Sequence, residues 1–98
     1  MAKAKWPFDE PPNVATITVR HIVEGGAPIL LVARDAEDGG WQFLTGGAFD
    51  VADGMVVSLR SIVERDPTLA ELADLEPGCQ ATRQRVGAPW KRSKQSEE

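Results

Sequence analysis

Hydrophobic and polar positions alternate along residues 15–23, which predicts a β-strand near the start of the chain. The inward side of this alternation is apolar and the outward side is polar: Ala15, Ile17 and Val19 against Thr16, Thr18 and Arg20. Residues 29–33 are continuously apolar, as expected of a central strand covered on both faces. Residues 41–45 form a third predicted strand between two glycine pairs, with Trp41 and Phe43 on one face.

Residues 58–77 show the spacing of helices instead. Ser58 can cap a first helix, and Asp66 followed by a proline can cap a second. Thr68 and Glu71 offer an alternative start for the second helix, because they have the spacing of a capping box. Each helix has a buried stripe of apolar residues: Leu59, Ile62 and Val63 in the first, and Leu69, Leu72 and Ala73 in the second.

The ends of the chain lack such patterns. The prolines of residues 1–13 indicate an irregular leader, which Trp6 and Phe8 can attach to the body. Residues 79–86 alternate weakly and predict a last strand at an edge of the sheet. Residues 91–98 are expected to form a disordered tail.

The predicted fold is one α+β domain at residues 14–90, with an antiparallel sheet of four to five strands and two short helices packed on one face. The antiparallel arrangement follows from connections that are too short for parallel crossovers. The predicted core contains six side chains: Ile17, Leu31, Trp41, Phe43, Ile62 and Leu72.

Composition places the protein in an ordinary soluble class. Of its 98 residues, 42% are hydrophobic and 27% are charged. No apolar run approaches the roughly 20 residues that cross a bilayer, and no apolar segment near the N-terminus resembles a signal peptide. Cys79 is alone, which agrees with a reducing compartment. We therefore expect a cytoplasmic protein that does not bind membranes.

The charge is unevenly distributed. Residues 6–90 contain 6 basic and 13 acidic residues, so this part of the chain repels nucleic acid phosphates and attracts a basic protein. The alternative interpretation is that an acidic surface only keeps a small protein soluble. Under the binding interpretation, the expected protein-binding residues lie in two acidic loops: Asp35, Glu37 and Asp38 in the first, and Asp50 and Asp53 in the second.

Catalytic, cofactor and metal sites find little support in the sequence. His21, the only histidine, falls on the inward side of its strand and is interpreted as a packed or hydrogen-bonded residue. Cys79 is interpreted as a small core or half-buried side chain, and a hydrolase that uses either residue is the weakest alternative. One histidine and one cysteine far apart exclude a structural zinc site. Arg83 and Arg85 share a face of the last strand, where cross-strand ion pairs are expected.

Three segments of the chain together resemble a known family. The stretch Gly40-Trp41-Gln42-Phe43-Leu44-Thr45-Gly46, the Asp66-Pro67 pair and the closing Pro77-Gly78 together resemble a small bacterial domain that was first catalogued as of unknown function. That domain was later assigned to the immunity proteins of polymorphic toxin systems. The resemblance covers roughly residues 15–85 and implies no catalytic residue and no cofactor.

Two functions follow as hypotheses. The first is a non-enzymatic acidic protein-binding domain, an immunity protein that neutralises a cognate toxin by occlusion. The second is a housekeeping or regulatory module that forms a homodimer through an exposed edge strand or binds a small ligand.

Overall fold

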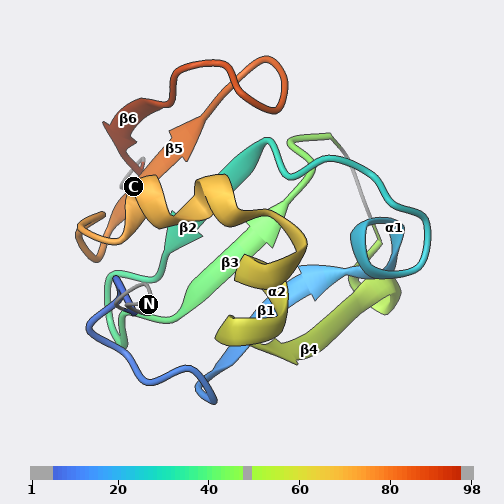
Figure 1. Ribbon diagram of the computed structural model, residues 1–98, viewed down its shortest axis with the longest axis horizontal. Coiled ribbons are helices and arrows are strands. Elements are labelled where there is room, and N and C mark those ends of the chain that lie inside the picture. The colour runs from blue at the N-terminus through green and yellow to red at the C-terminus, as the bar shows by residue number, and fades with distance from the viewer. Residues whose placement is uncertain (1–5, 48–49, 96–98) are drawn as a thin grey trace, which may run out of the picture.

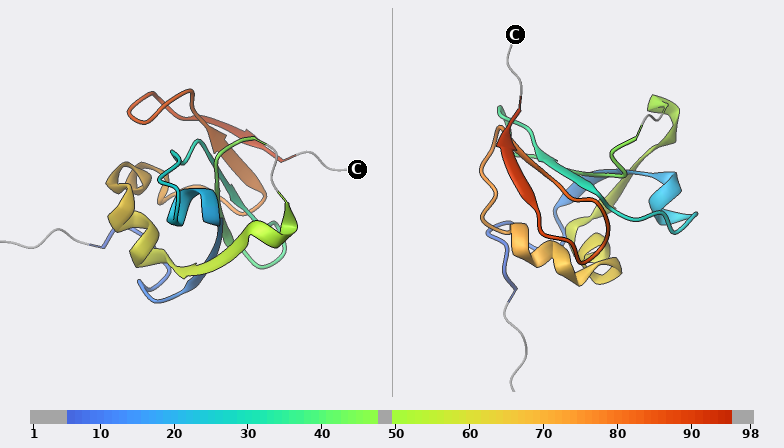
Figure 2. Two further views of the ribbon diagram at one scale, coloured as in Figure 1. Left: turned by 90° about the vertical axis from the view of Figure 1, so that its right-hand side faces the viewer. Right: turned by 90° about the horizontal axis from the view of Figure 1, so that it is seen from above.

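The computed structural model describes residues 6–47 and 50–95, and its six strands form one mixed sheet in the order β4-β1-β3-β2-β5-β6 (Figure 1). The strands are β1 (Ala15–Val19), β2 (Leu31–Arg34), β3 (Trp41–Leu44), β4 (Gly54–Ser58), β5 (Cys79–Thr82) and β6 (Lys91–Lys94). The helices are α1 (Arg20–Val23) and α2 (Leu59–Arg65), with 3-10 helices η1 (Val51–Asp53) and η2 (Pro67–Leu72). Because α2 and η2 lie together on one face of the sheet (Figures 1 and 2), the predicted α+β class is confirmed, with six strands in place of four to five.

The order of the strands differs from the predicted antiparallel arrangement. β1 lies between β4 and β3 and runs parallel to β3, with Ile17 opposite Gln42. β2 lies on the other side of β3 and forms an antiparallel hairpin with it. Residues 20–40, which contain α1 and β2, connect the two parallel strands. This connection is long enough for a crossover, so the assumption that every connection was too short is wrong.

The buried and exposed sides of β1 are largely the reverse of the prediction. Thr16 and Thr18 have only 2% and 0% of their surface exposed, whereas Ile17 is 49% exposed. The Thr18 hydroxyl donates to the Phe43 carbonyl at 2.7 Å, and the Thr16 hydroxyl donates to the Val57 carbonyl at 3.0 Å. A threonine whose hydroxyl finds a carbonyl can be buried, and its branched Cβ suits a strand. The predicted core position of Ile17 is therefore wrong.

Aromatic side chains fill the space between the helices and the sheet. Trp41 and Phe43 stack with their ring centroids 5.8 Å apart and an interplanar angle of 4°. Phe8 packs edge-on against Trp41 with a centroid distance of 5.3 Å, and Trp6 lies 5.4 Å from Phe8. The described part of the leader is therefore attached to the core, and residues 1–5 lie outside the described residues. The other predicted core residues are buried or half-buried: Trp41, Phe43, Ile62 and Leu72 are buried and Leu31 is half-buried.

Local capping determines where α2 and η2 begin. The Ser58 Oγ accepts a hydrogen bond from the Ser61 amide at 3.1 Å and starts α2. The Asp66 Oδ1 accepts one from the Thr68 amide at 3.1 Å and starts η2, with Pro67 at the first position. Both predicted stripes face the core: Leu59, Ile62, Leu69 and Leu72 are buried, and Val63 and Ala73 are half-buried. Within the described residues, no helix is long and apolar enough to span a membrane.

The C-terminal part of the chain forms a hairpin. β5 pairs with β2 on one side and with β6 on the other, so β5 is not the edge strand that the sequence predicted. Residues 91–94, expected to be disordered, form β6, and residues 96–98 lie outside the described residues. The Gln95 side-chain amide donates to the carbonyls of Arg34 at 2.6 Å and Cys79 at 3.0 Å, which attaches the end of this hairpin. A solvated edge strand rich in cations has the same composition as a disordered tail, which explains the error.

Candidate functional site

The face of the sheet opposite α2 and η2 carries two exposed aliphatic side chains. We call this surface the open face and define it by Ile17 on β1, Gln42 on β3 and Val56 on β4. Strand register places Ile17 opposite both Gln42 and Val56, so the three side chains lie in a row on one face. Ile17 is 49% exposed and Val56 is 71% exposed. Neighbouring exposed aliphatic residues at the same place on a sheet are a mark of interaction surfaces.

A hollow of about 310 Å³ lies beside the open face, and acidic residues contribute to its lining. Ile17, Gln42 and Val56 all line it, together with Asp35 and Asp38 from the turn between β2 and β3. The hollow therefore combines apolar side chains from β1 and β4 with carboxylates from a turn that is distant from them in sequence.

Hydrogen bonds within the turn hold these carboxylates in place. The Asp35 Oδ1 accepts hydrogen bonds from the amides of Glu37 at 2.7 Å and Asp38 at 3.3 Å, and the Asp38 Oδ1 accepts one from the Gly40 amide at 2.8 Å. Gly39 has φ +71°, which a residue with a side chain rarely adopts, and its amide donates to the Asp35 carbonyl at 2.9 Å. No hydrogen bond among the described residues uses the Oδ2 atom of either aspartate. One oxygen of each carboxylate thus remains for a partner.

The second predicted acidic loop lies at the opposite end of the sheet. The turn that contains Asp35 precedes β3, whereas Asp50 and Asp53 follow it, and Gly54 lies opposite the last residue of β1. Asp53 contacts α1, with its Oδ1 3.5 Å from the Arg20 Nε and its Oδ2 3.9 Å from the His21 Nε2. The five predicted binding residues therefore form two separate groups, and only Asp35 and Asp38 of the first group line the hollow, whereas Glu37 does not.

The structure does not bring His21 and Cys79 together. β1 ends at Val19 rather than near Val23, and His21 lies on α1 with its side chain 52% exposed, so its predicted inward position is wrong. Cys79 lies on β5 and is half-buried, as predicted. β3 and β2 separate β1 from β5 in the sheet. Among residues 6–47 and 50–95, no three His, Cys, Asp or Glu side chains gather in a group that could hold a metal ion.

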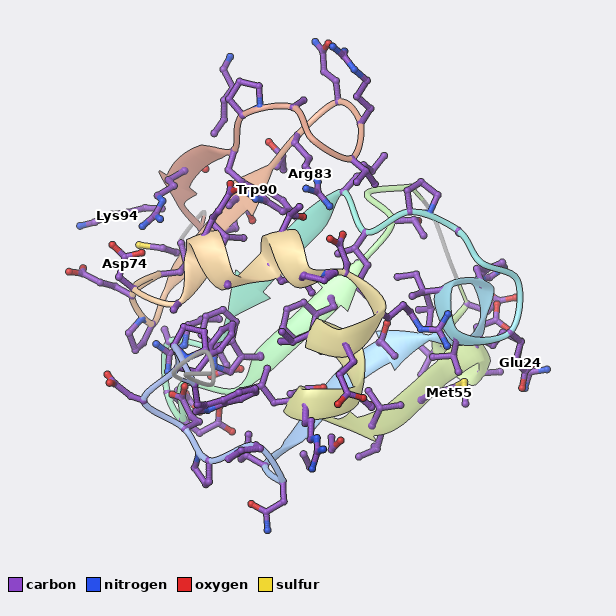
Figure 3. All side chains as sticks on the ribbon, viewed as in Figure 1. Glu24, Met55, Asp74, Arg83, Trp90 and Lys94 are labelled. Carbon is purple, nitrogen blue, oxygen red and sulfur yellow. The ribbon has the colours of Figure 1, made fainter. Side chains whose placement is uncertain are left out.

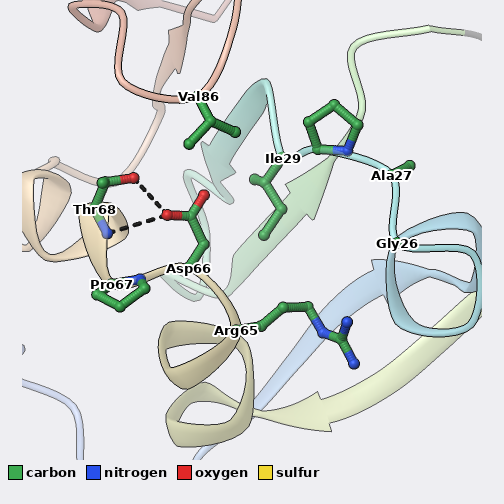
Figure 4. Close-up of a pocket in the computed structure, with 9 residues that line it drawn as sticks. Gly26, Ala27, Ile29, Arg65, Asp66, Pro67, Thr68 and Val86 are labelled. Carbon is green, nitrogen blue, oxygen red and sulfur yellow. Dashed lines mark hydrogen bonds between the residues drawn. The ribbon is translucent and has the colours of Figure 1, made fainter.

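A second hollow, of about 380 Å³, lies where the loop before β2 meets the junction of α2 and η2 (Figure 4). Asp66 is its acidic residue, and internal partners bind both of its oxygens. The Thr68 hydroxyl donates to Oδ1 at 2.5 Å, and the Arg83 Nη2 donates to Oδ2 at 2.6 Å. The prediction of a cross-strand ion pair for Arg83 is therefore wrong, because Asp66 caps η2 and does not lie on a strand. Sequence reasoning missed the Asp66–Arg83 pair, because no local pattern connects Arg83, just after β5, with an aspartate 17 residues earlier.

A third hollow, of about 590 Å³, lies on the basic side of the molecule and is lined by Arg83, Arg85 and Lys91. The Arg83 guanidinium stacks on Trp90 at 4.1 Å from the ring centroid (Figure 3). Residues 79–95 contain five basic and no acidic residues, whereas residues 6–78 contain 13 acidic and four basic residues. The charge is thus divided between an acidic body and a basic hairpin.

A second ion pair, in addition to Asp66–Arg83, joins these two regions. The Arg92 Nη2 donates to the Asp74 Oδ1 at 2.8 Å and to the Glu71 carbonyl at 2.9 Å. The hydrogen bond from Arg92, with the positive charge of the same guanidinium, lowers the pKa of Asp74 below its ordinary value. This pair therefore attaches β6 to the end of η2.

No protein-family model, curated protein or solved structure matches this chain in comparisons with known proteins. The choice among the three hollows therefore depends on their chemistry. The carboxylate of Asp66 is engaged by Thr68 and Arg83, and the hollow beside Arg85 has cations and no carboxylate among the described residues of its lining. The hollow at the open face combines exposed aliphatic side chains with carboxylate oxygens that have no internal partner, so we take it as the candidate site.

Proposed function

We propose that this chain is a non-enzymatic protein-binding domain whose open face receives a basic protein partner. The observation that carries the proposal is the hollow where exposed Ile17 and Val56 lie beside the carboxylates of Asp35 and Asp38. Protein interfaces commonly have an apolar centre and a polar rim. An anionic rim favours a cationic partner and increases its rate of association.

In its most specific form, the proposal names a toxin domain as the partner. This step rests on the resemblance of residues 40–46 and of the two proline-containing pairs to immunity proteins. A toxin that acts on nucleic acid needs a cationic groove, which an acidic inhibitor can cover without chemistry of its own. The net negative charge of residues 6–78 supports such an encounter, and the cytoplasm is the compartment where it would take place.

The first test is coexpression with the product of the adjacent gene. We expect this chain to restore growth to cells that express that product and to copurify with it. If neither rescue nor copurification is observed, the toxin form of the proposal is rejected.

The second test locates the binding surface by removing charge without disturbing the turn. The changes Asp35→Asn, Glu37→Gln and Asp38→Asn keep the side-chain oxygens that accept the turn hydrogen bonds. We expect the triple variant to bind the partner about tenfold more weakly and with a smaller dependence on salt, mainly through slower association. Surface plasmon resonance at several salt concentrations measures both effects.

The matched control removes three negative charges elsewhere, with Asp50→Asn, Glu71→Gln and Glu76→Gln. All three residues are exposed, and none lines the hollow at the open face. The control should bind within about threefold of the unchanged chain, because screening weakens distant charges. Equal losses in the two triple variants would show that net charge, and not the open face, determines binding.

A further inference from the structure

The two edges of the sheet differ sharply in chemistry. β6 forms one edge, and three of its four residues are cations exposed to solvent: Lys91, Arg92 and Lys94. Charges of this kind are a common protection against pairing with another strand. β4 forms the other edge, and the sequence Gly54–Ser58 contains no charged residue and no proline. The protein thus protects one edge of its sheet and leaves the other edge suitable for pairing.

The backbone of β4 presents a defined set of groups at this edge. The Leu59 amide donates to the Val14 carbonyl at 2.8 Å, so by strand alternation the backbone groups of Met55 and Val57 face β1. Those of Gly54, Val56 and Ser58 face away from the sheet. Internal bonds already occupy two of the outward groups, since the Gly54 amide donates to the Val51 carbonyl and the Ser58 carbonyl accepts from the Ser61 hydroxyl.

The remaining outward groups of β4 are complementary to those of a second β4 strand that runs antiparallel to it. They are the amide and carbonyl of Val56, the amide of Ser58 and the carbonyl of Gly54. When two β4 strands pair about a two-fold axis at Val56, each Val56 amide meets the Val56 carbonyl of the other copy. Each Ser58 amide then meets the Gly54 carbonyl of the other copy. The Gly54 amide of each copy also faces the Ser58 carbonyl of the other copy, and both groups already have hydrogen-bond partners within their own chain.

We propose that a second copy of this chain pairs with β4 in this register and forms a symmetric homodimer with one continuous twelve-stranded sheet, twice the six strands of one chain. The side chains fit the same arrangement. Val56 of each copy lies next to its counterpart and is flanked by Ile17, so four exposed aliphatic side chains form one row across the open face. Apolar cross-strand neighbours of this kind stabilise a sheet.

Side chains of opposite charge lie at the two ends of β4. Asp53 immediately precedes the strand, and Arg60 follows it at the start of α2. In the antiparallel register, the end of β4 that carries Asp53 in one copy lies near Arg60 of the other copy, at both ends of the pairing. Asp53 and Arg60 already have partners within the chain, Arg20 at 3.5 Å and Glu64 at 3.0 Å. These charges are therefore compatible with the antiparallel register, and the backbone groups of β4 select it.

This inference does not depend on the proposed function. The pairing uses the backbone edge of β4 and leaves Asp35 and Asp38 at the border of the open face in each copy. The experiment uses the purified chain alone, so its outcome is independent of any other protein.

Sedimentation of the purified chain over a wide range of concentrations tests the dimer. We expect the unchanged chain to have twice the mass of its 98 residues, and Val56→Lys to have the mass of a monomer, because the substitution places two cations side by side at the axis. The matched control is Val86→Lys, the same change at another exposed valine, which should remain a dimer. Circular dichroism confirms that both variants are folded.

A covalent test checks the register even if Val56→Lys does not fold. Val56→Cys in a Cys79→Ala background should form a disulfide-linked dimer on mild oxidation, since paired residues in this register lie roughly 5.5 Å apart at Cα, within the range of a disulfide. Val86→Cys in the same background should not form one. A monomer at every concentration, or equal cross-linking of the two cysteine variants, would overturn the proposal and leave the edge to a strand of another protein.

Discussion

The side chain of Arg83 joins three separate parts of the chain although only 1% of its surface is exposed. Its Nε and Nη2 donate to the Ile29 carbonyl at 3.1 and 2.9 Å, before β2. Its Nη1 donates to the Thr68 hydroxyl at 2.8 Å and its Nη2 to Asp66 at 2.6 Å, at the junction of the helices. Its planar face stacks on Trp90, before β6. Only a guanidinium offers this combination of a donor fork and a flat cation.

Removing this side chain should be costly. We expect Arg83→Ala to lower the free energy of unfolding by about 3–5 kcal/mol, because it leaves the buried Asp66 carboxylate without its cation. Arg83→Lys should also destabilise the protein, since an ammonium group cannot replace the fork or the stack. The control is Arg85→Ala, two residues along the chain and exposed, with a cost within about 0.5 kcal/mol. Urea unfolding measures all three, and equal costs at positions 83 and 85 would contradict this role.

A second residue-scale expectation concerns pH. The pKa of Asp74 is lowered in the folded protein, first by the hydrogen bond from Arg92 and then by the charge of that side chain. A lowered folded pKa means that the carboxylate contributes stability above its unfolded pKa, and that this contribution is lost as the pH falls through the folded pKa. Arg92→Gln should therefore raise the pKa of Asp74 toward its ordinary value.

NMR titration of the Asp74 carboxyl carbon measures this shift. The matched control is Lys94→Gln, which removes one positive charge from the same strand without touching Asp74. It should leave the pKa of Asp74 nearly unchanged. Similar shifts in the two variants would mean that general charge, and not the Arg92 contact, lowers this pKa.

At the scale of elements, the signals that act over a few residues were predictable. The glycine pairs around β3, the Ser58 cap of α2 and the Asp66-Pro67 start of η2 all depend on neighbours in the sequence, and each is found in the structure. The parallel pairing of β1 with β3 depends on contacts between distant segments, so no local pattern reveals it. The face of β1 was assigned incorrectly because alternation treats threonine as polar, whereas Thr16 and Thr18 find carbonyl partners inside the protein.

Two isoleucines that the sequence placed in the core provide a test of this correction. Ile62 on α2 is 1% exposed, whereas Ile17 on β1 is 49% exposed. We expect Ile62→Ala to lower the free energy of unfolding by about 2–4 kcal/mol, because it leaves a cavity in the core. The same change at Ile17 should cost less than about 1 kcal/mol. Urea unfolding compares the two variants directly, and equal costs would contradict the arrangement of β1.

At the scale of the whole molecule, the acidic part of the candidate site was predictable and its apolar part was not. Charge alone identified Asp35, Glu37 and Asp38, but the strand order brings Ile17 and Val56 beside that turn. The same order separates Asp50 and Asp53 from the first acidic loop. The basic hairpin was visible as five cations without an anion in residues 79–95, yet its place in the sheet depends on pairing between β5 and β6.

The contrast between the two sheet margins also limits how far copies of this protein can assemble. Once each copy has used its neutral strand β4, only the cationic strand β6 remains exposed at either side. Joining two such assemblies through β6 would set like charges close together, because each strand contributes three cations, one of which is paired with Asp74. In the proposed homodimer, growth would therefore stop at a closed pair, without the open-ended fibres that unprotected strands on both sides would permit.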